Sequence, residues 1–370
     1  MINIVLILAC SFIISVFAMP SIITVAKLLG LYDNPNNRKL HTTKIPRLGG
    51  IGIFVSFLLS IWFVIPDQSL PNARFLYSAL LLLFFSGLKD DIVMMSPINK
   101  LLIQLIASGL ITIGQGIVID HFHGIFGINE IPYFASIVLS IFTIIVITNS
   151  INLIDGVDGL AGGIGLIISL SFALWFNYTG QSGFALMAFA LSGALLGFLL
   201  FNFNPAKIFM GDAGSLTAGF LLSIFAIKFI SINSPISNFE NKILSAPAIA
   251  VSIFIVPLYD TLRVFIIRCI KRKSPFAADR NHIHHVLLKI GLNHKMVCFT
   301  LYAISILFAL TAILIKDNPS YIVLTIIVGM AVVVGQLPVY LYRHRLTDLE
   351  VEENNINFEN DINPFQNLKK

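Results

Sequence analysis

Long apolar runs dominate this chain and decide what it can fold into. The first, residues 2 to 26, has no charged residue, and similar runs follow as far as residue 342. Apolar stretches of about 18 or more residues are typical of membrane-spanning helices, because a helix satisfies its own backbone hydrogen bonds in hydrocarbon. The chain is 56% hydrophobic and 12% charged, against ~25% charged residues in soluble domains. We therefore expect an all-α, polytopic membrane protein.

The apolar runs predict about eleven membrane-spanning helices. They are expected near residues 2–26, 48–65, 74–88, 101–119, 131–148, 160–178, 183–201, 214–232, 245–264, 296–315 and 320–342. Because the intervening loops are short, the expected organisation is one transmembrane catalytic domain, residues 1–345, and a flexible tail, residues 346–370. The first run has no basic residue before it, which predicts a retained helix rather than a removed signal peptide.

Basic residues divide unequally between the two ends of these spans. Of the 24 Lys and Arg, 20 belong to one set of loops and helix ends, and the other set holds only Arg74, Lys228, Lys242 and Lys316. The positive-inside rule assigns the richer set to the cytoplasm, which predicts an external amino terminus and a cytoplasmic carboxyl terminus. The net charge of +5 then reflects topology, and no basic, aromatic groove indicates a nucleic-acid partner.

The segment NSINLIDGVDGLA, which begins at Asn149, places polar groups between long apolar runs. Two carboxamides, Asn149 and Asn152, and two carboxylates, Asp155 and Asp158, recur there at every third residue. In a helical approach this spacing brings neighbours to one side. Polar groups without partners would be costly in these surroundings. The segment is therefore a candidate metal or phosphate site.

Two further loops on the predicted cytoplasmic side carry acids. KDDIVMMSPINK contains Asp90 and Asp91 and ends on Lys100, and NFNPAKIFMGDAGS contains Asp212 just before a predicted helix. Each loop alone also fits a helix cap, since carboxylates are favoured at helix starts. Caps do not explain why three loops on one face carry several acids, so we expect them to converge on one site.

A histidine-rich segment, DRNHIHHVLLKIGLNHK, follows a basic run on the same side. It contains His282, His284 and His285. Zinc is weakly indicated, because Cys10, Cys269 and Cys298 lack ligand spacing. Two interpretations stay open, and both could hold: histidine donors that contact phosphate, and an interfacial amphipathic helix with Val286, Leu287, Leu288 and Ile290 against lipid.

The segment GLYDNPNNRKLHTTKIPRLGG, residues 30–50, is basic and kept extended by two prolines. An anionic headgroup would suit it, although basic residues belong in any cytoplasmic loop. No phosphate-binding P-loop pattern occurs, so ATP is not implied. Asp260 and Arg263 lie one turn apart near a predicted helix end and are interpreted as an intramembrane pair.

These segments resemble those of the polyprenyl-phosphate N-acetylhexosamine-1-phosphate transferases, bacterial enzymes of glycosyltransferase family 4. The resemblance covers about residues 25–345 and rests, in order, on PNNRKLHTTKIPRLGG, the pair Asp90 and Asp91, NSINLIDGVDGLAGG, IFMGDAGS and DRNHIHH. It implies transfer of N-acetylglucosamine-1-phosphate, or a related amino-sugar phosphate, from a UDP-sugar to undecaprenyl phosphate. UMP would be released at the cytoplasmic face of the bacterial plasma membrane, with Mg²⁺ or Mn²⁺ as cofactor, and the product would initiate a cell-envelope polysaccharide such as O-antigen or teichoic acid.

The resemblance also implies residue roles. It assigns metal binding to Asp212 and Asn152, catalytic roles on the nucleoside-sugar side to Asp155 and Asp158, and an acceptor or base role to Asp90 and Asp91. The implied substrate-binding residues are Lys100, Arg280, His282, His284, His285, Asn149, Arg38, Lys39 and His41. A phosphate monoester has its second pKa near ~6 and is mostly dianionic at neutral pH. We therefore favour Asp90 and Asp91 as organisers of metal and acceptor over proton abstraction.

Three alternatives are weighed against this interpretation. The phospho-MurNAc-pentapeptide transferases share the acids but usually carry a continuous histidine triplet, from which HIHH departs. A cation-coupled transporter would place its acids near the bilayer centre in two related halves, and no internal repeat is seen. The CDP-alcohol phosphotransferases need D-G-x-x-A-R, which fails after Asp155. The sugar and the oligomeric state, including a homodimer, stay open.

Overall fold

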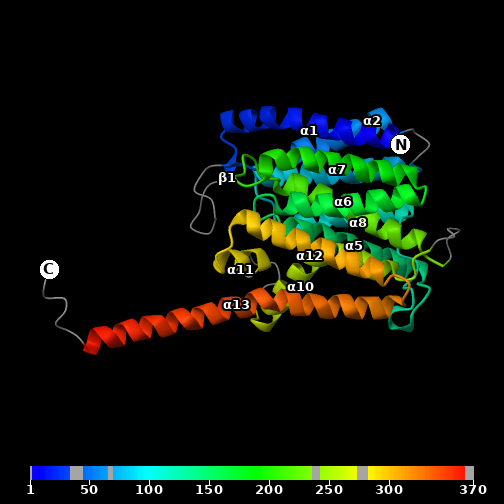
Figure 1. Cartoon of the computed structure of the whole chain (residues 1–370). Helices are drawn as coiled ribbons and strands as arrows, with labels where there is room; N and C mark the ends of the chain where they lie inside the picture. Colours follow the sequence, from blue (N-terminus) through cyan, green and yellow to red (C-terminus); the bar gives the residue numbers. More distant parts are fainter. Residues whose placement is uncertain (1, 34–44, 66–69, 236–241, 273–281, 363–370) are drawn as a thin grey trace.

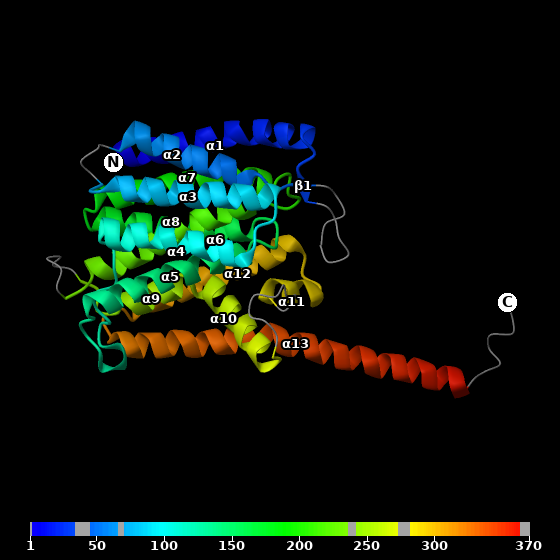
Figure 2. The same cartoon turned by 180° about the vertical axis from the view of Figure 1, so that it is seen from behind.

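The computed structural model describes residues 2–33, 45–65, 70–235, 242–272 and 282–362, with the backbone alone at residues 33, 343 and 345–362. Helices dominate it, and one short antiparallel pair joins β1 (Tyr32–Asp33) to β2 (Ile45–Pro46). The long helices run side by side in a bundle (Figures 1 and 2). The expected all-α class is confirmed.

The helices follow the apolar runs. In chain order they are α1 (Ile2–Leu28), α2 (Gly49–Val64), α3 (Ala73–Ile92), α4 (Pro97–Gly109) with the π-helical turn η2 (Leu110–Gln115), η3 (Ile125–Gly127), α5 (Tyr133–Leu153), α6 (Leu160–Tyr178), α7 (Ser182–Asn202), α8 (Gly211–Ile232), α9 (Ala246–Ile253), α10 (Ile255–Ile270), α11 (Ile283–Lys289), α12 (His294–Leu314) and α13 (Ser320–Ile362).

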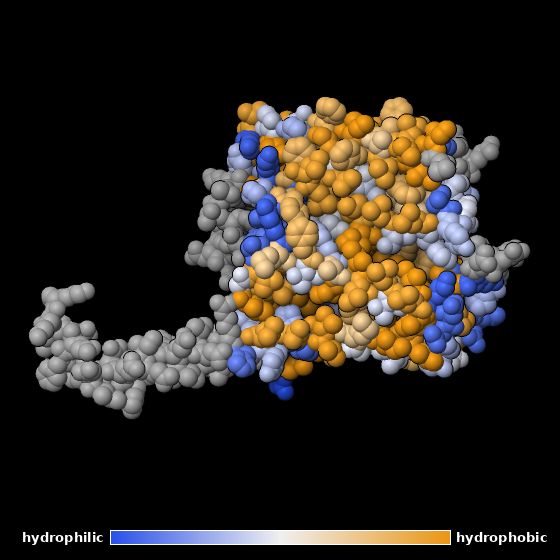
Figure 3. Space-filling view, in the orientation of Figure 1, coloured by the Kyte–Doolittle hydropathy of each residue, from blue (hydrophilic) through white to orange (hydrophobic). Residues whose placement is uncertain are grey.

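All eleven expected spans fall on these helices, although not all are full-length crossings. Within the described ranges, eight helices are long and apolar enough to span a membrane, or nine if α9 and α10, bent by 78°, count as one. The helix α2 is a shorter apolar helix. Figure 3 shows a broad apolar belt bounded at both ends by hydrophilic residues, as a bilayer requires. The polytopic membrane class is confirmed, and the number of crossings stays a prediction.

The helix α8 forms the centre of the bundle. In its most apolar stretch 89% of residues are buried, against 22% for α1, which lies at the edge. Small residues permit close approach at its start, since a Cβ on Gly87 of α3 would lie 2.5 Å from the Cα of Ala213. Gly50 at the start of α2 packs equally closely against Gly214. The first turn of α8 is therefore packed closely between α2 and α3.

The motif-bearing segments meet at one end of the bundle, where α3, α5 and α7 finish and α4, α6 and α8 begin. We call this the motif end. The amino terminus lies at the opposite end (Figure 1). The helix α13 continues to Ile362, through most of the segment expected to be a tail, and the flexibility of that segment stays a prediction.

Candidate active site

The amino terminus of α8 is capped by a residue from another helix. The two carboxylate oxygens of Asp91 accept hydrogen bonds from the backbone N–H groups of Asp212, at 2.8 Å, and Ala213, at 3.0 Å. The helix has no capping side chain of its own. Because the first backbone N–H groups of a helix lack internal partners, Asp91 anchors α3 to α8. Its carboxylate is thereby turned toward backbone.

The adjacent Asp90 faces a cation instead. Its Oδ2 lies 2.7 Å from Nζ of Lys100, and Asp212 Oδ2 lies 2.5 Å from the same Nζ. Asp90 also accepts a hydrogen bond from the backbone N–H of Met95 at 2.5 Å. The side chain of Ser96 caps α4 by accepting a hydrogen bond from the backbone N–H of Asn99. The helix therefore begins one turn before Lys100. Three separate segments therefore bring two carboxylates to one ammonium group.

Asn152, at the end of α5, joins this group. Its amide Nδ2 donates to Asp212 Oδ1 at 3.2 Å and to Ser215 Oγ at 2.7 Å. Asn149, one turn earlier, pairs through its amide with Gln104 of α4, where Nδ2 lies 2.7 Å from Oε1. Asn152 therefore belongs to the acidic group directly, whereas Asn149 links α5 to α4 beside it.

The carboxyl group of Asp155 is affected by the charges of the same acids. It lies in the turn between α5 and α6 and is only partly exposed. Burial raises the pKa of its carboxyl to about 7, and the negative charges of Asp212 and Asp91 add to the shift. Placing the ionised carboxylates of Asp91, Asp155 and Asp212 near one another is therefore unfavourable unless a cation binds between them.

Asp158 forms hydrogen bonds with the loop before α8. Its Oδ2 accepts from Asn204 Nδ2 at 3.0 Å and from the backbone N–H of Ala206 at 3.2 Å. Nδ1 of His294 lies 3.9 Å from its other oxygen. Only 2% of Asp158 is exposed. The role implied for it, on the nucleoside-sugar side, stays a prediction.

The turn that carries Asp155 and Asp158 is held by two other helices. Tyr302 of α12 donates its hydroxyl hydrogen to the carbonyl of Gly159 at 2.5 Å, and Cys298 donates to the carbonyl of Asp158 at 3.1 Å. Asn202, the last residue of α7, accepts from the N–H of Gly159 at 2.9 Å. Gly159 has a φ of +85°, a conformation that favours glycine. These contacts fix the path of the turn.

The histidine segment is anchored on Asp260 of α10. Asp260 Oδ1 accepts from the backbone N–H of Ile283 at 2.7 Å, and Oδ2 lies 3.0 Å from Nδ1 of His282 and 3.8 Å from Nδ1 of His284. Burial lowers the pKa of His284 to about 3, although Asp260 opposes the shift, so its ring is neutral near pH 7. Sequence reasoning missed this role of Asp260 and considered only Arg263 as its partner.

His284 connects this segment to the acidic turn. A Cβ built on Gly156 would lie 2.9 Å from Nε2 of His284. His282 and His284 stack with ring centroids 5.5 Å apart, and the more accessible His285 packs beside His284 at 4.4 Å. The structure therefore brings all three histidines to the motif end, beside the turn that carries Asp155.

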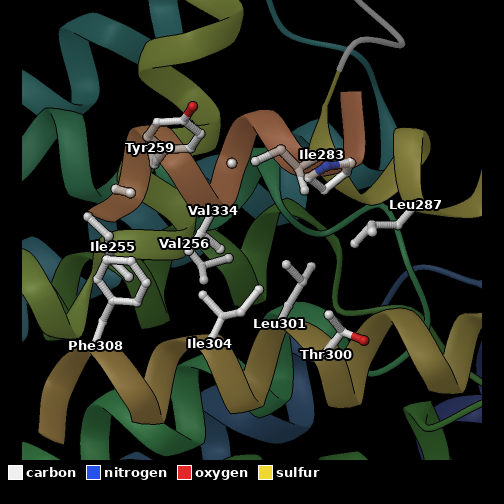
Figure 4. A pocket seen from close by; sticks show the side chains of 13 residues that line it. Ile255, Val256, Tyr259, Ile283, Leu287, Thr300, Leu301, Ile304, Phe308 and Val334 are labelled. Carbon is white, nitrogen blue, oxygen red and sulfur yellow. The ribbon is translucent and has the colours of Figure 1, made fainter. Parts of the chain in front are cut away.

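Two residues of the helix α11, Val286 and Leu287, pack against protein, which corrects the interpretation that placed them against lipid, whereas Leu288 and Ile290 are partly exposed. Val286 is 7% exposed and Leu287 is 6% exposed. Figure 4 shows Ile283 and Leu287 facing Leu301 across a small apolar cavity of about 60 Å³ between α10, α11, α12 and α13. The apolar residues of this segment therefore position the histidines within the fold.

Within the described residues, the acidic group does not form a closed metal site by itself, and the metal ion stays a prediction. Across the described part of the chain, no group of three or more His, Cys, Asp or Glu side chains is placed to hold a metal on its own, and the three cysteines are free. Mg²⁺ is usually held by one or two carboxylates together with substrate phosphates. Asp212, with Asn152 beside it, could supply one such carboxylate, and a metal ion there would compete with the ammonium group of Lys100 for the Asp212 oxygens.

The basic segment before α2 reaches this site through its backbone. The N–H of Phe209 donates to the carbonyl of Pro46 at 2.8 Å, and the N–H groups of Gly49 and Gly50 donate to the carbonyls of Phe209, at 2.9 Å, and Met210, at 2.8 Å. Four of the expected substrate-binding residues lie outside the described residues, namely Arg38, Lys39, His41 and Arg280.

Sequence reasoning also missed residues that have no motif. Gln104, Cys298 and Tyr302 lie in apolar helices with no local pattern to mark them. Asn202 opens the segment NFNPAKIFMGDAGS, and an asparagine at a helix end is a signal for a capping role. Their contacts become evident only when the helices are assembled.

The fold and the site thus define the class of protein: a polytopic helical membrane bundle with an acidic site at one end. Residues 73–230 match the model of glycosyl transferase family 4. The chain is 31% identical, over 88% of its length and 89% of the relative's, to a probable undecaprenyl-phosphate N-acetylglucosaminyl 1-phosphate transferase of Bacillus subtilis. It is 32% identical, over 78% of its length and 77% of the relative's, to a decaprenyl-phosphate N-acetylglucosaminephosphotransferase of Mycobacterium tuberculosis.

An Escherichia coli relative, an undecaprenyl-phosphate alpha-N-acetylglucosaminyl 1-phosphate transferase, is 31% identical over 73% of this chain and 72% of its own. The residues matched by the family model, 73–230, include Asp90, Asp91, Asp155, Asp158 and Asp212. The chain belongs to glycosyl transferase family 4, so the resemblance noted from its motifs is confirmed.

Proposed function

We propose that this protein transfers N-acetylglucosamine-1-phosphate from UDP-N-acetylglucosamine to undecaprenyl phosphate and releases UMP. The product would be an undecaprenyl-diphosphate sugar that initiates a cell-envelope polysaccharide. The observation that carries the proposal is the convergence of Asp90, Lys100, Asn152 and Asp212 at one end of a membrane bundle. The names of the relatives support the polyprenyl phosphate acceptor and the amino sugar.

The residues fit a reaction between two anions. The acceptor phosphate is mostly dianionic at neutral pH, so bringing it to a diphosphate is harder than activating it. Lys100 offers an ammonium group at the junction of α3, α4 and α8, where it can stabilise charge on the transferred phosphoryl group. Asp90 orients Lys100 from one side and Asp212 from the other.

Magnesium is the proposed cofactor, with Mn²⁺ as a possible substitute. Asp212 would hold it, with Asn152 contributing its amide oxygen after rotation of the amide. The ion would neutralise the donor diphosphate. Asp155, whose pKa is raised to about 7 beside Asp212 and Asp91, completes the negative surroundings that favour a divalent cation.

We assign the polyprenyl chain of the acceptor to an apolar groove along α5. It has a volume of about 260 Å³ and is lined by α5, α8, α9, α10 and the loop before η3. Val146 and Ile147 line it one turn before Asn149. From there the groove follows α5 away from the motif end. A polyprenyl chain lying in it would have its phosphate beside the acidic group.

The test is incubation of the purified protein with undecaprenyl phosphate, Mg²⁺ and a panel of UDP-sugars, with UMP release measured. We expect release with UDP-N-acetylglucosamine, loss of release with EDTA, and recovery with Mg²⁺ or Mn²⁺. UMP release only with a MurNAc-pentapeptide donor would overturn the sugar assignment. Absence of release with every donor would contradict the proposed reaction.

A further inference from the structure

A second apolar recess lies between α3 and α4, apart from the groove along α5. It has a volume of about 550 Å³. Its lining residues are Ser78, Leu81, Leu82, Phe85, Ser86, Lys89, Met95 and Ile103. We call it the α3–α4 cleft. The proposed reaction makes no use of it.

One stripe of α3 forms most of the cleft wall. The α3 positions recur three or four residues apart, which places them on one helix face. Ser78 starts the stripe and Lys89 ends it eleven residues later, a distance of ~16 Å along a helix. This is about half of the ~30 Å hydrocarbon core, or one leaflet. The cleft therefore spans the leaflet on the side of the motif end.

The wall is not covered by protein. Leu81 is 41% exposed, Leu82 is 42% exposed and Phe85 is 61% exposed. In a membrane protein such side chains meet lipid. An acyl chain matches the length of one leaflet and therefore of this cleft, and the polyprenyl chain of the acceptor is already assigned to the groove along α5.

The end of the cleft at the membrane surface carries a cation. Lys89 is exposed and forms no ion pair with the described residues. The neighbouring Lys100 is engaged by Asp90 and Asp212. A lysine at the end of an apolar stem can reach the headgroup region and attract an anionic phosphate.

We propose that the α3–α4 cleft binds one anionic phospholipid of the surrounding bilayer, with its phosphate at Lys89 and an acyl chain along α3. A lipid in this cleft would lie beside the turn between α3 and α4. Lys89 precedes Asp90, and Met95, which also lines the cleft, donates its N–H to Asp90. A bound lipid contacts both sides of the turn that orients Asp90.

The test counts phospholipids retained by the full-length protein in native mass spectra, with phosphatidylglycerol and phosphatidylcholine in equal amounts. We expect the intact chain to retain phosphatidylglycerol preferentially. Lys89→Gln should reduce that preference about fivefold, since one lysine near an anionic surface contributes ~1 kcal/mol. The matched control is Lys27→Gln, an exposed lysine in the last turn of α1, which should leave the preference unchanged.

A second pair of variants tests the apolar part. Ser78→Phe narrows the end of the cleft away from Lys89 and should lower retention of both lipids, whereas Ser21→Phe on the exposed face of α1 should not. Equal effects of Lys89→Gln and Lys27→Gln, or full retention by Ser78→Phe, would overturn the proposal. Displacement of phosphatidylglycerol by equimolar undecaprenyl phosphate, dependent on Lys89, would also overturn it by reassigning the cleft to the acceptor.

Discussion

Two adjacent carboxylates in this protein have different partners. Asp91 binds the backbone N–H groups of Asp212 and Ala213, and Asp90 binds Lys100. Consecutive residues on a helix point in directions about 100° apart, so a single helix end can serve a structural contact and a charged site. The geometry supports Asp90 as an organiser of the site and gives Asp91 a stabilising role.

Replacing Asp91 should therefore affect stability more than replacing Asp90. Asp91→Ala leaves two helix-start N–H groups unpaired, and we expect a loss of ~1–3 kcal/mol in unfolding free energy. Asp91→Asn keeps one acceptor and should lose less. Unfolding in mixed micelles, followed by circular dichroism, measures the difference. A larger loss for Asp90→Ala than for Asp91→Ala would contradict the capping role.

Asp155 predicts a pH dependence. Its folded pKa is raised from 3.8 to about 7, so between these values the folded protein holds a proton that the unfolded chain has lost. Stability from this group therefore falls as pH rises from about 4 to about 7. In EDTA, Asp155→Asn should raise the melting temperature at pH 8 and change it little at pH 4. An equal shift at both pH values would refute the assignment.

At the scale of elements, α12 and α7 fix the turn between α5 and α6. Tyr302→Phe removes the hydroxyl that donates to the Gly159 carbonyl. Loss of one such hydrogen bond is worth ~1 kcal/mol, so we expect about a fivefold decrease in kcat/KM for the UDP-sugar. Tyr321→Phe, on an exposed position of α13, is the control. Unchanged kinetics for Tyr302→Phe would show that the turn holds its shape without this contact.

Close helix approach at the motif end gives another test. Gly87→Ala would place a Cβ 2.5 Å from the backbone of Ala213, which cannot yield as a side chain does. We expect a loss of ~1–3 kcal/mol or more. Gly109→Ala in α4 meets nothing within 4 Å and should be neutral or slightly stabilising. Thermal unfolding of the two variants compares them, and equal melting temperatures would contradict the packing argument.

For the whole molecule, the distribution of basic residues predicts which end faces the cytoplasm. Lys271 follows α10 at the motif end, and Lys316 follows α12 at the opposite end. In a cysteine-free background, a membrane-impermeant thiol reagent added to intact cells should label Lys316→Cys and spare Lys271→Cys. Permeabilised cells provide the control, since both should then react. The reverse pattern would invert the proposed orientation and move the site outside.

Much of the fold was predictable because the bilayer imposes a local rule on sequence. Each apolar run had to become a helix, so runs such as residues 131–148 and 296–315 lie on α5 and α12. Helix ends were less predictable. The run near residues 245–264 is divided between α9 and α10 by a 78° bend, where Pro257 has no N–H to donate to the carbonyl of Ile253.

The sequence by itself determined the membrane class, the family and the set of acids, since apolar length and motif order are properties of the chain alone. Only the tertiary structure decided that Asp90 faces Lys100, that Asp91 caps α8, and that Asp158 turns toward Asn204. The reason is physical. The partner of a carboxylate depends on which helices approach closely, and that approach is set by small residues and buried contacts far apart in the chain.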